Sequence, residues 1–274
     1  FADADTPVDL PDLAQVSDDP APRFRWHFTG KIVAIDSSGK LPSEDSSKKL
    51  RNSDVFSVIA FDPTSRLEST VLDAKDENLQ IFRHAALGNG EQKKLNICLD
   101  PRFSSVLEPL PIEDQREADR SSAEVLTKLP IKTVALDSIE GLESLDWLIL
   151  DELSDALTIL DHGAETLADA LLVQVRVVFQ PTHCGQPDFP SIQGWMSEHG
   201  FRFYRFNGEQ YETHMPATVS ESDRHRTDLQ SAEAIFVPDN TRSKCLTDNQ
   251  RMKLAFILHT VYGIKDLTYS LLRE

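Results

Sequence analysis

Short, continuously apolar segments recur along this chain, and they constrain its fold more than any other feature. They span residues 31–35, 56–61, 79–83, 93–99, 132–136, 147–150, 171–179 and 201–206. Continuous rather than alternating apolar residues are typical of strands that helices cover on both faces. Because helical patterns separate several of these segments, the chain predicts an α/β domain with a mostly parallel central sheet.

Three segments carry the helical part of this pattern. Leucine and alanine recur every three or four residues from Leu153 to Leu171, which predicts one amphipathic helix over 153–171. Residues 190–199 predict a second helix that ends at Gly200, and residues 249–262 predict a third.

Charge and composition exclude some classes of partner. The chain has a net charge of -17, with 40% hydrophobic and 27% charged residues. An acidic surface repels phosphates, so we expect neither a nucleic-acid partner nor an anionic membrane partner. No apolar run approaches the ~18 residues that a membrane-spanning helix needs.

The cysteines bear on compartment and metal binding. Cys98, Cys184 and Cys245 lie far apart, and none belongs to a CxxC pair. This pattern favours free thiols in a reducing compartment, so we expect a cytoplasmic protein without a metal site.

The chain divides by composition into three parts. Residues 1–23 are rich in Asp and Pro and predict a flexible acidic lead-in; because the chain opens on Phe1, we expect further residues before it in the full-length protein. Residues 24–206 carry the strand and helix pattern of the main domain. Residues 207–274 predict a polar excursion, a final strand and a C-terminal helical extension packed on the same domain. A further surface excursion is expected over 111–130.

Residues 31–42, KIVAIDSSGKLP, raise the question of a cofactor. An apolar run breaks there into a polar turn with one glycine, the place where α/β proteins hold nucleotide cofactors with backbone amides. Asp62 and Asp151 follow two other apolar runs. Asp151 therefore lies either where ligands bind in open sheets or at the N-cap of the next helix.

Longer motifs connect these positions. They are VIAFDPTSRLEST (58–70), NLQIFRHAALGNGEQKKLNICLDPRFSSVLEP (78–109), IKTVALDSIEGLESLDWLILDELSDALTILDHGAETL (131–167) and VVFQPTHCGQPDFPSIQGWMSEHGFRFYRF (177–206). In this order they resemble the FkbM-type family, a branch of the class I S-adenosylmethionine (SAM)-dependent methyltransferases. The resemblance implies a class I methyltransferase-like Rossmann fold, with SAM as cofactor and a sugar or small-metabolite hydroxyl as methyl acceptor.

The resemblance also implies site residues. Asp36, Gly39, Asp62 and His84 would contact the cofactor, with Asp62 on the ribose hydroxyls and His84 beside the adenine. Independently of the resemblance, methyl transfer to an alcohol benefits from a general base, and Asp151 and His183 are the candidates for it. Each has a simpler alternative: Asp62 as the polar end of a strand, His84 as an ordinary strand-end histidine. The pair His183–Cys184 carries neither a metal nor a nucleophile pattern.

Departures from the family motifs support a second hypothesis. Ala34, Asp36 and Lys40 stand where the first motif has an acid and two glycines. Later motifs lose a lysine, a glycine and three glutamates, at Ile149, Ser154, Ala156, Gln174 and Arg176. A non-catalytic relative that serves as a binding or scaffolding module would show this pattern. Its partner would be a protein, whereas the enzyme would act on a small molecule or a glycan.

Overall fold

The computed structural model describes residues 25–43, 45–52, 54–64, 66–67, 76–116, 119–216 and 218–273. Contacts divide the described residues into two compact units, one formed by 25–29 and 246–273 and the other by those between 30 and 245. The predicted lead-in, residues 1–23, lies outside the described residues.

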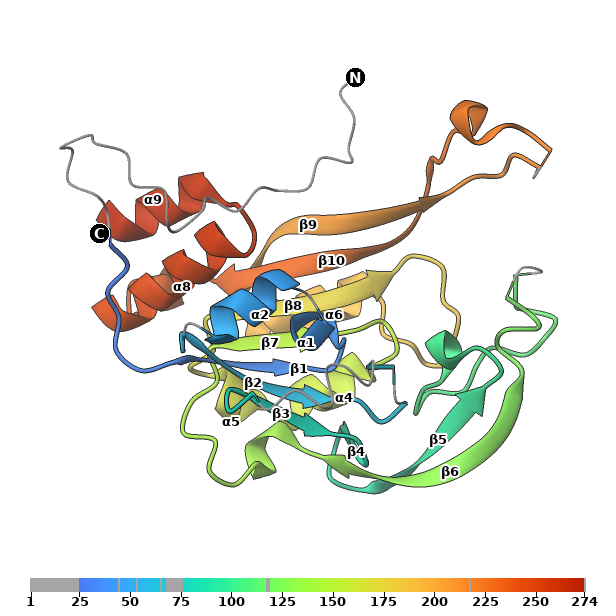
Figure 1. Ribbon diagram of the computed structural model, residues 1–274, viewed down its shortest axis with the longest axis horizontal. Helices are drawn as coiled ribbons and strands as arrows, with labels where there is room; N and C mark the ends of the chain where they lie inside the picture. The colour runs from blue at the N-terminus through green and yellow to red at the C-terminus, as the bar shows by residue number, and fades with distance from the viewer. Residues whose placement is uncertain are drawn as a thin grey trace. The chain divides into compact units, whose positions relative to one another are not determined.

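The larger unit is built on a seven-stranded sheet of order β3-β2-β1-β7-β8-β10-β9 (Figure 1). The strands are β1 (Ile32–Asp36), β2 (Phe56–Phe61), β3 (Leu79–Phe82), β7 (Trp147–Leu150), β8 (Leu172–Val178), β9 (Phe201–Glu212) and β10 (Asp228–Pro238). Neighbouring strands are parallel except where β10 pairs antiparallel with β8 and β9. This mostly parallel sheet with flanking helices confirms the predicted class I methyltransferase-like Rossmann fold.

Short helices accompany the sheet. They are α1 (Lys40–Ser43), α2 (Asp45–Asn52), α4 (Ala156–Asp161), α5 (Ala164–Leu167), α6 (Phe189–Glu198) and α7 (Asn240–Ser243). Helix α6 confirms the prediction over 190–199: Asp188 caps its start, and Gly200 follows its end with a φ of 76°.

The single helix predicted over 153–171 is wrong. The chain forms α4 and α5 instead, with His162 and Gly163 between them. A Cβ on Gly163 would lie 2.5 Å from Leu136 Cδ1, so the backbone here packs directly against Leu136. Tertiary packing at the glycine therefore overrides a continuous apolar stripe.

A second sheet, of order β4-β6-β5, belongs to the same unit. It contains β4 (Ala85–Leu87), β5 (Gln92–Cys98) and β6 (Val125–Val134). Strand β6 pairs parallel with β4 and antiparallel with β5. The surface excursion predicted over 111–130 is therefore shorter, because its last residues belong to β6.

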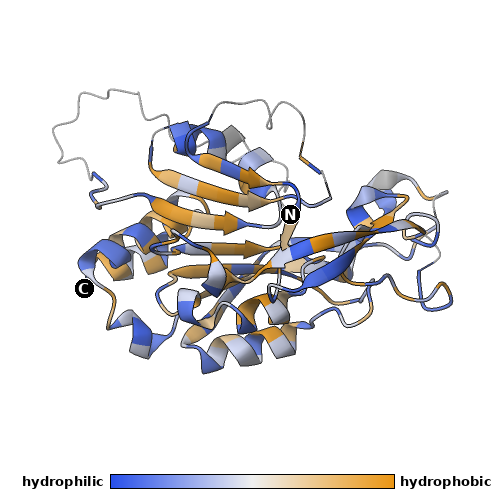
Figure 2. Ribbon diagram, turned by 90° about the horizontal axis from the view of Figure 1, so that it is seen from below, coloured by the Kyte–Doolittle hydropathy of each residue, from blue (hydrophilic) through white to orange (hydrophobic). Residues whose placement is uncertain are grey.

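The core lies around the central strands. All four residues of β7 are buried, as are Val173, Val175 and Val177 of β8. In Figure 2 the strands of the central sheet are largely orange, whereas the helices carry both blue and orange. Burying each such aliphatic side chain contributes about 1.5–3 kcal/mol, so the core holds the strand ends in place.

The smaller unit contains α8 (Asp248–Thr260) and α9 (Lys265–Arg273), and α8 confirms the helix predicted over 249–262. Thr247 and Gln250 form a capping box at the start of α8. Trp26 and Phe28 pack on Phe256, with ring centroids 5.3 and 5.5 Å away. None of the described helices combines the length and apolarity needed to span a membrane.

Candidate functional site

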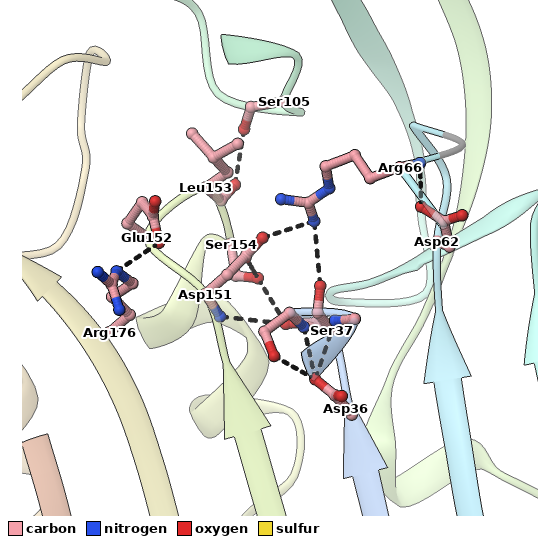
Figure 3. A network of polar contacts seen from close by, with 12 residues as sticks. Asp36, Ser37, Asp62, Arg66, Ser105, Asp151, Glu152, Leu153, Ser154 and Arg176 are labelled. Carbon is pink, nitrogen blue, oxygen red and sulfur yellow. Dashed lines mark hydrogen bonds and ion pairs between the residues drawn. The ribbon is translucent and has the colours of Figure 1, made fainter. Parts of the chain in front are cut away.

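The topology brings three strand ends together. Strands β2 and β3 lie on one side of β1, and β7 lies on the other, so the strand order reverses beside the carboxyl end of β1. Open α/β sheets bind ligands at such a switch point. Asp36, Asp62 and Asp151 lie at the ends of β1, β2 and β7 on this side of the sheet, and Arg66 lies between Asp62 and Asp151 (Figure 3). We call this place the crevice.

Asp36 turns its carboxylate toward its own loop. Its Oδ1 accepts hydrogen bonds from Ser38 N at 2.7 Å, Ser38 Oγ at 2.6 Å and Gly39 N at 3.2 Å, and its Oδ2 accepts one from Leu41 N at 2.8 Å. Burial raises the pKa of Asp36, although these donors work in the opposite direction. The backbone amides that would face a cofactor thus bind a side chain of the protein.

Asp62 organises the turn after β2. Its Oδ1 accepts from Arg66 N at 2.8 Å, and its Oδ2 accepts from Leu67 N at 3.1 Å. The carboxylate is buried, and each oxygen keeps further acceptor capacity. Asp62 therefore holds Arg66 over the crevice, whether or not it also contacts a ribose.

Arg66 crosses the crevice. Its Nη2 donates to Asp151 Oδ2 at 2.6 Å and to the Ser37 carbonyl oxygen at 3.1 Å. Burial opposes the charge, but the neighbouring Asp151 carboxylate outweighs it and raises the pKa of Arg66. One guanidinium therefore ties the end of β1 to the end of β7, from a residue that follows β2.

Asp151 is held from both sides. Its Oδ1 accepts from Ser154 Oγ at 2.5 Å, opposite the bond from Arg66 to Oδ2, and only 5% of the residue is exposed. The N-cap of α4 is Asp155, which accepts from Thr158 N, and not Asp151. The simpler of the two roles predicted for Asp151 is thereby excluded.

A second group of charges adjoins the crevice. Arg176 lies 3.3 Å from both Glu152 and Glu233, and Lys40 Nζ lies 3.0 Å from Glu233 Oε1. Burial and the nearby Asp151 raise the pKa of Glu152, whereas Arg176 lowers it. Lys40 and Arg176, which replace a glycine and an acid of the family motifs, thus pair with carboxylates of this chain.

Neither histidine is among the described residues that line the crevice, although the Asp151 carboxylate is near enough to act on His183 and opposes the lowering of its pKa by burial. His84 is exposed between β3 and β4, outside the described lining of the crevice. His183 is buried; its Nε2 lies 2.9 Å from the Phe103 carbonyl oxygen and its Nδ1 lies 2.9 Å from Thr182 Oγ1. Because the carbonyl only accepts, Nε2 carries the proton and Nδ1 accepts from Thr182. Burial lowers the pKa of His183, which favours this neutral form.

The remaining space in the crevice is small. The cavity has a volume of about 40 Å³ and is lined by Ser37, Arg66, Ser105, Asp151 and Ser154, among others. Pockets for cofactors and other small ligands span roughly 300–1,000 Å³. Side chains of the chain itself also make the polar contacts that a cofactor would make. The residues present in this arrangement therefore do not fit SAM.

Arg66, Glu152 and Glu233 are the residues of this site that the motifs did not reveal. Glu233 had a detectable signal, because it is an acid flanked by alanines in the buried second half of β10, where a charge needs a partner. For Arg66 the only signal in the sequence was its position four residues after Asp62.

No family model matches the chain, and no curated protein matches it. Among solved structures it is similar to magnesium protoporphyrin IX methyltransferase from Synechocystis PCC 6803 with bound SAM, at 10% identity over 77% of this chain and 71% of that chain, with a TM-score of 0.39. It is also similar to precorrin-6y C5,15-methyltransferase from Geobacter metallireducens GS-15, at 9% identity over 77% and 84% of the two chains, with a TM-score of 0.35. Likeness at this level concerns the fold and says nothing of cofactor or reaction. The FkbM-type branch stays a prediction from the motifs.

Proposed function

We propose that this chain uses the class I methyltransferase fold as a non-catalytic binding module. The observation that carries the proposal is the crevice, which holds only about 40 Å³. Arg66 closes it by bonding Asp151 and Ser37, while the Asp36 carboxylate occupies the amides of the first loop. The same part of the chain departs from the family motifs, with Asp36 and Lys40 at glycine positions and Arg176 at an acidic position.

The contacts of Arg66 set the energetic cost of opening the crevice. To admit SAM, the guanidinium would have to leave both oxygens that it bonds. Hydrogen bonds to charged groups contribute roughly 1.5–3 kcal/mol each, and solvent at the 27% exposed guanidinium restores part of this, so opening costs about 2–4 kcal/mol. Since each 1.4 kcal/mol changes an affinity tenfold, SAM would bind roughly 30- to 1,000-fold more weakly than to an open site.

A second candidate function is SAM-dependent O-methyl transfer to a sugar or small-metabolite hydroxyl. One observation favours it: Asp62 and Asp151 are buried carboxylates at the ends of β2 and β7, where the fold places ligand contacts. The Arg66 side chain is 27% exposed, so solvent reaches the group that closes the crevice.

Charge and cysteine chemistry bear on partners and compartment under either function. The net charge of -17 supports a protein or small-molecule partner rather than a nucleic acid or an anionic membrane. Cys98, Cys184 and Cys245 are free, which supports a reducing, cytoplasmic location.

Thermal unfolding with SAM and with S-adenosylhomocysteine distinguishes the two functions. A ligand at about 100 times its Kd stabilises the folded state by about 2.7 kcal/mol, and each kcal/mol raises Tm by roughly 2–4 °C. We expect no ligand-dependent shift at about millimolar ligand in a sample whose far-UV circular dichroism shows it to be folded.

The variant Asp62→Ala is the matched control. Because Asp62 also caps the turn, the comparison is between each protein with and without ligand, not between their absolute Tm values. A shift of several degrees in the native protein that disappears in Asp62→Ala would overturn the non-catalytic proposal and support the methyltransferase.

A further inference from the structure

The dipeptide Asn-Gly occurs twice in this chain, at Asn89–Gly90 and at Asn207–Gly208, and a glutamate follows each pair. Before a glycine, the backbone nitrogen of the next residue can approach the asparagine side chain closely, because glycine has no Cβ. The local sequence therefore gives the two asparagines the same intrinsic reactivity toward their own backbone. The structure gives them different surroundings.

The side chain of Asn89 folds over the turn between β4 and β5. Its Oδ1 accepts a hydrogen bond from Glu91 N at 3.1 Å, and its Nδ2 donates to Glu91 Oε2 at 2.9 Å. Both ends of the planar amide therefore bind residue 91, so the Cγ atom between them is held beside the peptide that joins Asn89 to Gly90. Holding two reacting groups in this way favours the reaction between them.

The backbone nitrogen of Gly90 is the nucleophile of this pair. Gly90 is exposed, a Cβ placed on it would have no atom within 4 Å, and its N–H makes no hydrogen bond with the described residues. Solvent can therefore take its proton. Glu91 N and, at 3.4 Å, Thr133 Oγ1 both lie near Asn89 Oδ1, the oxygen that becomes negative when Cγ is attacked. Donors at such an oxygen stabilise the intermediate.

Asn207 lies instead within a strand pair and a network of charges. It is opposite Glu233 in the ladder between β9 and β10, and its Nδ2 donates to Glu233 Oε2 at 3.2 Å. The same glutamate is 5% exposed and accepts from Lys40 Nζ. To react with Gly208 N, the Asn207 amide would have to leave a charged partner while the strand opens, and both steps are unfavourable.

We propose that Asn89 is a site of spontaneous deamidation. Gly90 N loses its proton to solvent and forms a bond to Asn89 Cγ; the bond from Cγ to Nδ2 breaks, and Nδ2 leaves as ammonia with a proton from solvent. Water then opens the resulting five-membered imide. Cleavage at Cγ gives aspartate, and cleavage at the main-chain carbonyl carbon gives isoaspartate. The net reaction consumes one water and releases one ammonia, so it needs no oxidant, reductant or enzyme.

The product changes the turn that follows β4. An aspartate at position 89 would face the Glu91 carboxylate that the amide now binds, and like charges so close together repel. Isoaspartate also adds one main-chain carbon to the turn. Because Ala86 and Leu87 of β4 line the crevice, the modified turn closely follows part of the crevice wall. The inference does not rest on the proposed function.

Peptide mapping by mass spectrometry tests the proposal on the intact chain. The folded protein and the protein unfolded in guanidinium chloride are kept in warm, mildly alkaline water enriched in heavy oxygen, which labels each deamidated residue. We expect Asn89 to convert about tenfold or more faster than Asn207 in the folded protein, and the two to convert at similar rates when unfolded. Equal rates in the folded protein, or an Asn89 that folding protects, would overturn the proposal.

The variant Glu91→Ala tests the positioning of the amide, with Glu209→Ala as its matched control after the other Asn-Gly pair. Both glutamates are exposed, so neither change should disturb folding. We expect Asn89 to convert about threefold or more slowly in folded Glu91→Ala, at the native rate in Glu209→Ala, and near the native rate in Glu91→Gln, which keeps an acceptor for Nδ2. A native rate in Glu91→Ala, or the same slowing after unfolding, contradicts a role for the folded turn.

Discussion

Replacing Arg66 by methionine should destabilise the protein by about 2–4 kcal/mol, although it keeps an unbranched side chain of similar length. The change removes the hydrogen bonds from Nη2 to Asp151 and to the Ser37 carbonyl oxygen. Removing one partner of a buried ion pair typically costs about 3–5 kcal/mol. Arg66 is 27% exposed while Asp151 is almost fully buried, so we reduce that range by about 1 kcal/mol for solvent screening.

The assay is urea unfolding followed by circular dichroism, on Arg66→Met, on Asp151→Asn and on the double variant. The double-mutant cycle isolates the energy of the Arg66–Asp151 contact, which we expect to be about 1–3 kcal/mol. Arg102→Met is the matched control, since it removes an Arg–Asp pair, with Asp100, whose arginine side chain is 83% exposed. Such surface pairs contribute less than about 1 kcal/mol. An Arg66→Met protein as stable as Arg102→Met would refute the view that Arg66 closes the crevice by a buried contact.

Two other predictions concern packing and protonation. Gly163→Ala should destabilise the protein by about 1–3 kcal/mol, because the added Cβ would lie 2.5 Å from Leu136 Cδ1. Gly194→Ala should instead stabilise α6 by about 0.5–1 kcal/mol, because a Cβ added there would have no neighbouring atom within 4 Å. Thermal melts of both variants check this, and equal effects at the two glycines would contradict it. The folded-state pKa of Asp36 is raised above its ordinary value of 3.8. Between the unfolded-state and folded-state pKa values, the native state therefore binds more protons than the unfolded state. The contribution of Asp36 to stability is consequently lost as the pH rises through the folded-state pKa. Carboxyl carbon NMR should give Asp36 an elevated pKa and the exposed Asp54, beside Lys31, a lowered one; the reverse order would be decisive against this account.

The strand ends were predictable because their signal is local. The apolar runs 56–61 and 147–150 coincide with β2 and β7, so Asp62 and Asp151 were correctly expected at the edge of the sheet. The single helix predicted over 153–171 was wrong because periodicity shows which residues are apolar, and it does not show that the backbone at Gly163 packs against Leu136. The predicted roles of His84 and His183 remain predictions, but the fold places neither among the described residues that line the crevice.

Local sequence alone determined the position of most strands, the end of α6 at Gly200 and the replacement of a family glycine by Asp36 in the first loop. Only the tertiary structure decided that the crevice is closed. Arg66 meets Asp151 across 85 positions of sequence, and Lys40 meets Glu233 across 193. Whether a charged side chain fills the crevice or points to solvent depends on which strand ends lie within hydrogen-bond distance of it. Those strand ends are far apart in the sequence, and the packing of the whole sheet brings them together, so no single motif predicts the contact.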